Sequence, residues 1–189
     1  MKNESVYIII GIIATAIGVY LTREQIKTGA EIIMKKLTRN EFVEKYAPIA
    51  KIASKGTGLF PSVFMAQAIL ESGNGNSSLA TKGNNFFGIK ADKSWTGPIV
   101  TMKTREVING KEVYVDAPFR AYKNPTDSFL DRVNFLTSMS RYRNAGVFIA
   151  PTPEAQAKAL QKAGYATDPV YADLLIKLIN QNDLKKYDT

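Results

Sequence analysis

The 189-residue sequence contains no cysteine and no histidine. It therefore cannot build Cys/His or Ser/His nucleophile systems, and it cannot ligate zinc through thiolate or imidazole groups. Peptide-cleaving enzymes of those kinds are excluded, and no disulfide can form. Carboxylate chemistry remains available, and glycosidic bonds are the substrate class that paired carboxylates commonly serve. Such acid/base cleavage needs no metal and no organic cofactor, so none is predicted.

The chain is basic, with 25 Lys and Arg against 17 Asp and Glu, for a formal net charge of +8. This charge favours an anionic partner, such as nucleic acid, a membrane or a cell wall. The basic residues are scattered among acids rather than interleaved with aromatics on one element, so no nucleic-acid partner is predicted. A generally soluble basic surface is the alternative explanation, and nothing in the sequence indicates an oligomeric state.

One long apolar run stands near the N-terminus, at residues 5–22, SVYIIIGIIATAIGVYLT. Its length matches a helix that crosses a hydrocarbon core. We expect residues 1–22 to form a single-pass membrane anchor and residues 23–37 a juxtamembrane spacer. A cleaved signal peptide with a site at Ala14-Thr15-Ala16 is the alternative, although the apolar run continues past that site.

The stretch that starts at Pro61, PSVFMAQAILES, predicts a short buried helix. Pro61 suits the first turn, and Gly73 stands just past the end. Glu71 is the one acidic residue of this helix. It lies in the last turn, where unpaired carbonyls and apolar neighbours both favour the protonated carboxyl. A carboxyl that stays protonated near neutral pH can act as a general acid; the alternative is an ordinary exposed Glu at a helix end.

Residues 73–90 form a loop rich in Gly and Asn, which can bring backbone and amide groups close to a ligand. Three pieces follow one another at close spacing: AILESG at 68–73, SLA at 78–80 and NNFFGIK at 84–90. Together they resemble glycoside hydrolase family 73, the glucosaminidase family of peptidoglycan hydrolases. The resemblance covers roughly residues 38–178 and leaves the anchor and a polar tail, residues 180–189, outside.

This resemblance implies a lysozyme-like α+β fold, with a mainly helical core and a β-hairpin lobe, here preceded by the single N-terminal transmembrane helix. We expect the glucosaminidase domain to span residues 38–189, beginning at Thr38, which forms a capping box with Glu41. The implied partner is the peptidoglycan glycan strand, and the catalytic domain would face the cell wall. Basic residues after the anchor instead favour the cytoplasmic side. Either that rule is overridden, or the anchor sits in another membrane, such as that of a bacterial virus particle carrying a lytic enzyme.

A hairpin is predicted after the loop, because Asn109-Gly110 separates two extended runs, Ile99–Thr104 and Glu112–Ala117. A two-residue turn places Glu106 opposite Val113. The family resemblance implies a second acidic residue on such a hairpin beside the cleft, and Glu106 fits that position. Glu112 is an alternative, and a solvated strand residue is another.

By resemblance, five further residues contact the substrate or shape its groove: Asn84, Asn85, Phe87, Tyr122 and Tyr165. Tyr122 belongs to the family piece Phe119–Tyr122, where packing is the alternative role. Tyr165 would position substrate or water beside Glu71, and Asp168 would cap the helix that follows.

The mechanism implied is that Glu71 protonates the leaving glycosidic oxygen, while Glu106 activates water or stabilises the oxocarbenium-like transition state. If Glu106 is too distant, the N-acetyl group of the substrate could supply the nucleophile. The bond would join N-acetylglucosamine to N-acetylmuramic acid. A muramidase, a lytic transglycosylase with one catalytic Glu, and a non-catalytic wall-binding or virion structural protein remain alternatives.

Overall fold

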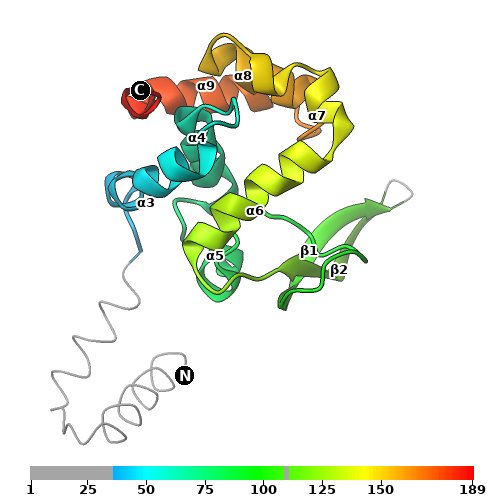
Figure 1. Cartoon of the computed structure of the whole chain (residues 1–189). Helices are drawn as coiled ribbons and strands as arrows, with labels where there is room; N and C mark the ends of the chain where they lie inside the picture. Colours follow the sequence, from blue (N-terminus) through cyan, green and yellow to red (C-terminus); the bar gives the residue numbers. More distant parts are fainter. Residues whose placement is uncertain (1–35, 109–110) are drawn as a thin grey trace, which may run out of the picture. The chain divides into compact units, whose positions relative to one another are not determined.

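The computed structural model describes residues 36–108 and 111–189, except for the side chains of residues 105–108 and 111 (Figure 1). The predicted anchor, nearly all of the predicted spacer and the turn Asn109-Gly110 lie outside this description. Within the described ranges, no helix is both long and apolar enough to span a bilayer. Residues Leu37–Thr189 form one compact unit.

Helices dominate this unit, and its two strands form one antiparallel hairpin. Figure 1 shows the hairpin standing apart from the helices α4, α8 and α9. The predicted α+β organisation, a mainly helical core with a β-hairpin lobe, is confirmed. The elements are α3 (Arg39–Ser54), α4 (Pro61–Ser72), α5 (Ser78–Gly83), β1 (Ile99–Ile108), β2 (Lys111–Arg120), α6 (Pro125–Ser138), α7 (Ser140–Asn144), η1 (Val147–Ile149), α8 (Pro153–Lys162), α9 (Tyr171–Gln181) and η2 (Leu184–Tyr187).

The helix boundaries follow local sequence signals. Thr38 caps α3 in the predicted capping box, since its side chain accepts from the Glu41 backbone and Glu41 bonds back to the Thr38 N–H. Pro61 occupies the first turn of α4, and Gly73 ends that helix in the left-handed conformation at φ 58°. The predicted termini of α4 are therefore confirmed.

The centre of the unit is α4, in which ten of twelve residues are buried. It packs against α3, α9 and η2. Aromatic rings from distant elements meet beside it, including Phe64 of α4, Phe87 of the following loop and Phe129 of α6. Each such ring contributes roughly 1.5–3 kcal/mol through burial. This packing fixes the end of α4, where Glu71 lies.

The C-terminal segment, residues 180–189, belongs to the same core, although the sequence motifs of the resemblance end before it. Leu184 is fully buried. The Asp188 carboxylate accepts hydrogen bonds from the Ser62 backbone N–H (2.8 Å) and hydroxyl (2.7 Å). Asp188 thus caps the N-terminus of α4 from a segment 126 residues away.

The hairpin has the predicted register, with Ile108 opposite Lys111 and Glu106 opposite Val113. Its strands are longer than expected, because the pairing runs without a break from Ile99 with Arg120 to Ile108 with Lys111. Along β2, the buried residues Ala117 and Phe119 alternate with exposed ones. The half of the hairpin away from its turn therefore has one buried face.

The last long helix begins later than the sequence indicated, at Tyr171 rather than beside Asp168. The Asp168 side chain instead accepts from the Val170 N–H (3.0 Å), and its carbonyl accepts from the Tyr171 N–H. Asp168 therefore closes a turn just before the helix. Short polar side chains often form such turns as an alternative to capping a helix.

Candidate active site

A groove of about 410 Å³ lies at the C-terminal end of α4. It is lined by Glu71, Phe87, Gly88, Ile89, Lys90, Asp92, Phe135, Arg141, Tyr142, Tyr165 and Ala166. The structure thus brings together three of the predicted site residues, Glu71, Phe87 and Tyr165. Two carboxyls and two cations share its lining with aromatic and apolar side chains.

Glu71 occupies the last turn of α4, as predicted. The residue as a whole is exposed, but protein atoms crowd its carboxyl. This desolvation raises the pKa of Glu71, and the Tyr171 hydroxyl, which donates to Oε1 at 3.1 Å, and the Arg132 charge partly offset the rise. The carboxyl is therefore biased toward the protonated form that a general acid requires.

Tyr165 lies half-buried in the turn between α8 and α9 and lines the same groove as Glu71. Its hydroxyl makes a long hydrogen bond (3.5 Å) to the Phe87 carbonyl, and its ring stacks on Tyr171 with centroids 5.5 Å apart. Burial raises the pKa of Tyr165 to about 12. The hydroxyl thus stays neutral and can donate to or accept from a bound ligand.

The loop amides form hydrogen bonds within the protein. The buried Asn85 side chain donates to the carbonyls of Ile89 and Arg120, and it accepts from the backbone N–H groups of Phe87 and Ile89. Asn84 donates to the Tyr122 carbonyl at 2.9 Å. Neither lines the groove. These bonds hold the loop against β2; substrate contact by the two amides stays a prediction.

Tyr122 lies apart from Glu71, in a hollow of about 350 Å³ beside Trp95 and α6. Its hydroxyl donates to Asp131 at 2.7 Å, and burial together with that carboxylate raises its pKa. Arg120 binds Asp131 on one side (3.0 Å) and Asp92 on the other (3.2 Å). This geometry gives Tyr122 a packing role at the base of the hairpin, and its contact with a sugar stays a prediction.

The second predicted catalytic residue, Glu106, lies in β1, and its side chain is among those outside the description. The groove lining supplies another carboxyl, that of Asp92. Hydrogen bonds from the Ser94 hydroxyl and backbone N–H, together with Arg120, lower the pKa of Asp92, so it is ionised where Glu71 favours its proton. Among the described residues, no three acidic side chains are grouped to hold a metal ion.

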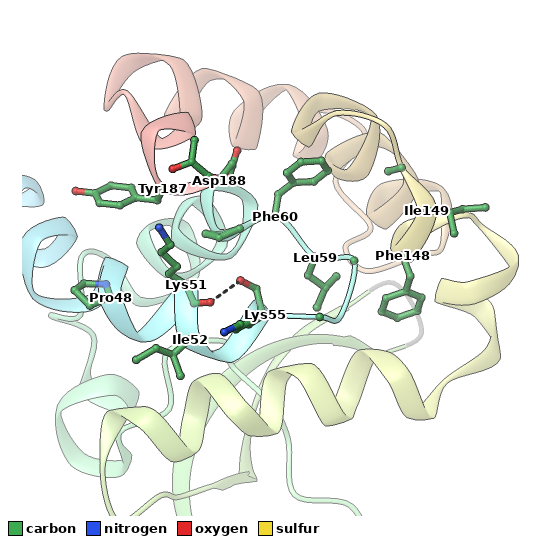
Figure 2. Close-up of a pocket in the computed structure, with 16 residues that line it drawn as sticks. Pro48, Lys51, Ile52, Lys55, Leu59, Phe60, Phe148, Ile149, Tyr187 and Asp188 are labelled. Atoms are coloured by element: carbon green, nitrogen blue, oxygen red, sulfur yellow. Dashed lines mark hydrogen bonds between the residues drawn. The ribbon is translucent and has the colours of Figure 1, made fainter.

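A larger hollow, of about 870 Å³, is shown in Figure 2. It lies between the end of α3, the start of α4, η1 and η2, and Ile52, Phe60 and Phe148 contribute to its largely apolar lining. Its acidic side chain, Asp188, is bound to Ser62. None of the predicted site residues lines it. The carboxyl of the larger hollow is therefore engaged at the start of α4, whereas the smaller groove contains Glu71.

Three site residues were missed by sequence reasoning: Gln67, Arg132 and Tyr171. Gln67 and Arg132 carry a signal in retrospect. Gln67 is a polar residue one helical turn before Glu71 in an otherwise apolar helix, and Arg132 interrupts the apolar face of α6. Both are fully buried, which is rare for such side chains unless they are partnered.

Comparison with known proteins independently supports the family resemblance. The sequence model of the Glucosaminidase family, described as mannosyl-glycoprotein endo-beta-N-acetylglucosaminidase, matches residues 47–184. The peptidoglycan hydrolase FlgJ of Vibrio parahaemolyticus is 41% identical over 140 residues, which are 72% of this chain and 45% of that protein. The exo-glucosaminidase LytG of Bacillus subtilis is 39% identical over 150 residues, 78% of this chain and 52% of LytG.

The fold has a solved counterpart in the catalytic domain of the autolysin Auto from Listeria monocytogenes. The TM-score is 0.72 at 32% sequence identity, and the alignment covers 89% of this chain and 99% of the Auto domain. By contrast, the chain spans about half the length of the curated relatives it matches. Family model, sequence relatives and fold agree, and they cover the element that carries Glu71: the chain belongs to the glucosaminidase family, glycoside hydrolase family 73.

Proposed function

We propose that the chain hydrolyses the β-1,4 glycosidic bond of peptidoglycan glycan strands, between N-acetylglucosamine and N-acetylmuramic acid, with Glu71 as general acid. The observation that carries this proposal is the Glu71 carboxyl, whose pKa is raised by desolvation, in a groove that also contains Tyr165. The names of the relatives, peptidoglycan hydrolase and exo-glucosaminidase, support the substrate class.

The second carboxylate is proposed to be Glu106, acting as base for water or stabilising the transition state. Strand alternation supports this choice over Glu112. Position 106 shares a face of β1 with Met102 and Thr104, both half-buried, whereas Glu112 is exposed. Asp92, ionised in the groove, is the other carboxyl that could take this role.

The test is digestion of purified peptidoglycan by the full chain, with the reduced products identified by mass spectrometry. We expect fragments ending in reducing N-acetylglucosamine. Glu71→Gln should lower the rate by about 10²- to 10⁴-fold, the usual contribution of a general acid. Glu44→Gln, the same change at an exposed α3 residue, is the matched control and should digest like the parent.

The same assay decides the remaining alternatives. Reducing muramic acid ends would indicate a muramidase, and anhydro-muramic ends a lytic transglycosylase. No fragments from the parent would leave a wall-binding or virion structural role. Glu106→Gln should slow the reaction, whereas Glu112→Gln should not. If both variants keep full activity, Asp92→Asn is measured next: a slower reaction would assign the role to Asp92, and full activity would indicate that the substrate N-acetyl group supplies the nucleophile.

We further propose, from the sequence, that residues 5–22 anchor the protein in a membrane and that the domain acts on the wall beyond it. The apolar run supports anchoring. Action on peptidoglycan requires the domain to lie on the wall side of whichever membrane holds the run, that of a cell or of a virus particle.

A further inference from the structure

In the part of the chain that the structure describes, Arg132 is a buried cation without a carboxylate partner. Its side chain, on α6, is 0% exposed. Its guanidinium lies 4.4 Å from the ring centroid of Tyr165 and 5.7 Å from that of Phe87. Within the described ranges, no ion pair joins it to an acid, and its Nε and Nη1 have no hydrogen-bond partner. Removing one charge from water is costly unless that charge is well compensated, so the position calls for a functional explanation.

The remaining nitrogen of Arg132 begins a chain of hydrogen bonds that ends at the catalytic carboxyl. Arg132 Nη2 donates to Gln67 Oε1 at 2.6 Å. Gln67 Nε2 donates to the Tyr171 hydroxyl oxygen at 2.8 Å. The Tyr171 hydroxyl donates to Glu71 Oε1 at 3.1 Å. Three elements, α6, α4 and α9, thus meet in one line of donors and acceptors.

The chemistry of Arg132 sets the direction of every bond in this line. A guanidinium has only donors, so Gln67 must turn its carbonyl oxygen toward Arg132 and its amide nitrogen toward Tyr171. The Tyr171 oxygen then accepts from Gln67, and its one hydrogen is directed at Glu71. Oε1 of Glu71 therefore receives a hydrogen bond whether the carboxyl is charged or neutral.

We propose that Arg132, Gln67 and Tyr171 are positioning residues that hold Oε1 of Glu71, so that Oε2 carries the proton given to the leaving glycosidic oxygen. This inference rests on the proposed function. When the glycosidic bond breaks, its electron pair stays on the leaving oxygen, which takes the Oε2 proton. Water then supplies a hydroxyl to the anomeric carbon and the proton that restores Glu71. Between these steps, the Tyr171 hydroxyl and the Arg132 charge stabilise the carboxylate.

Other titratable and charged groups face Glu71 from each side of the groove. They are Lys90 and Asp92 on the loop after α5, Arg141 and Tyr142 on α7, and Tyr165 between α8 and α9. Tyr171 is the group whose hydrogen bond to Glu71 lowers the pKa of that carboxyl, and Arg132 lowers it through its charge. Loss of either contribution should move the Glu71 pKa upward.

The first test is Tyr171→Phe in the full chain, with kcat/KM on peptidoglycan measured against pH. We expect kcat/KM to fall about tenfold to a hundredfold, the range for one hydrogen bond to a charged group. The basic limb, where Glu71 loses its proton, should move to higher pH. Tyr46→Phe, the same change at a buried tyrosine of α3 outside the groove, should alter neither. A basic limb that stays in place would overturn the proposal.

The second variant, Gln67→Glu, keeps the shape of the side chain and gives Arg132 a carboxylate partner, so folding is preserved even if Tyr171→Phe misfolds. The new carboxylate can only accept, so it draws the Tyr171 hydrogen away from Glu71. We again expect a slower enzyme with its basic limb at higher pH. Parent-like activity and pH profile would contradict the directed chain of bonds.

A third measurement separates this inference from the proposed function. The Glu71 carboxyl can be titrated by carbon-13 NMR in the full chain, with Glu71→Gln to assign the signal. An upward pKa in both variants supports the positioning role even if the parent digests no peptidoglycan, which would refute the proposed function alone. An unchanged Glu71 pKa refutes the positioning role, whatever the activity.

Discussion

At the scale of single residues, the proposed catalytic role of Glu71 conflicts with the stability of the fold. Its desolvated carboxyl has a raised pKa, so the folded protein favours the protonated form. A group whose folded-state pKa exceeds its unfolded value contributes stability at low pH, and that contribution is lost as pH rises through the folded pKa. Ionised Glu71 therefore destabilises the fold at pH values above its folded-state pKa.

We predict from this that Glu71→Gln stabilises the protein at pH 8 while it lowers activity by about 10²- to 10⁴-fold. The amide is neutral at every pH, and its oxygen can still accept from Tyr171. Thermal unfolding of parent and variant at pH 8 and pH 4 checks this: the variant should have the higher Tm at pH 8, and the difference should shrink or vanish at pH 4. A parent that is more stable at pH 8 would contradict a raised pKa.

At the scale of elements, the N-terminus of α4 depends on η2. Asp188 accepts two hydrogen bonds from Ser62, whose side chain is fully buried. We predict that Asp188→Ala lowers the free energy of unfolding by about 1–3 kcal/mol, the range for a lost cap that leaves a buried donor unsatisfied.

Urea unfolding measures this loss. The matched control is Asp116→Ala on β2, where an exposed carboxylate makes a 3.3 Å ion pair with Lys103. Surface pairs of this kind contribute about 0–1 kcal/mol, so the control should unfold much like the parent. Equal losses in the two variants would show that Asp188 does not act as a cap for α4.

Elements defined by neighbouring residues were predictable from sequence. Proline and glycine marked the two ends of α4, and Asn109-Gly110 set the hairpin register. What could not be predicted are contacts between distant segments. The Tyr171 bond to Glu71 joins residues 100 apart, and the Asp188 bond to Ser62 joins residues 126 apart. No periodicity or local motif encodes such pairs, because they exist only after α4, α9 and η2 have packed.

The residues of the candidate site differ in the same way: some could be predicted from local sequence and others could not. Glu71 could be found because its own helix places it in the last turn beside apolar neighbours, and Tyr165 and Phe87 because a family piece contains each. Substrate contact by Asn85 stays a prediction, since an amide in a Gly-rich loop can serve either a ligand or the backbone. The structure shows four bonds to backbone groups, a use that requires β2 to lie alongside the loop.

At the scale of the whole molecule, the chain divides at Lys36–Leu37 into a segment containing the apolar run and the glucosaminidase unit. The family match at residues 47–184 lies entirely within the second part. The proposed reaction and the proposed membrane anchor therefore belong to separate parts of the chain. If so, removing the first part should change where the protein resides and leave its reaction intact.

We predict that the full chain sediments with membranes, while a fragment of residues 37–189 stays in the supernatant and digests purified peptidoglycan at the parental rate. The reason is that 18 consecutive uncharged residues favour the hydrocarbon core, whereas every described residue that lines the groove belongs to the second part. Extraction at high salt is the control, because a chain of net charge +8 can also adhere to anionic lipid electrostatically. Release of the full chain by salt would show surface adhesion rather than an inserted anchor, and a fragment with altered digestion would show that the first part contributes to the active site.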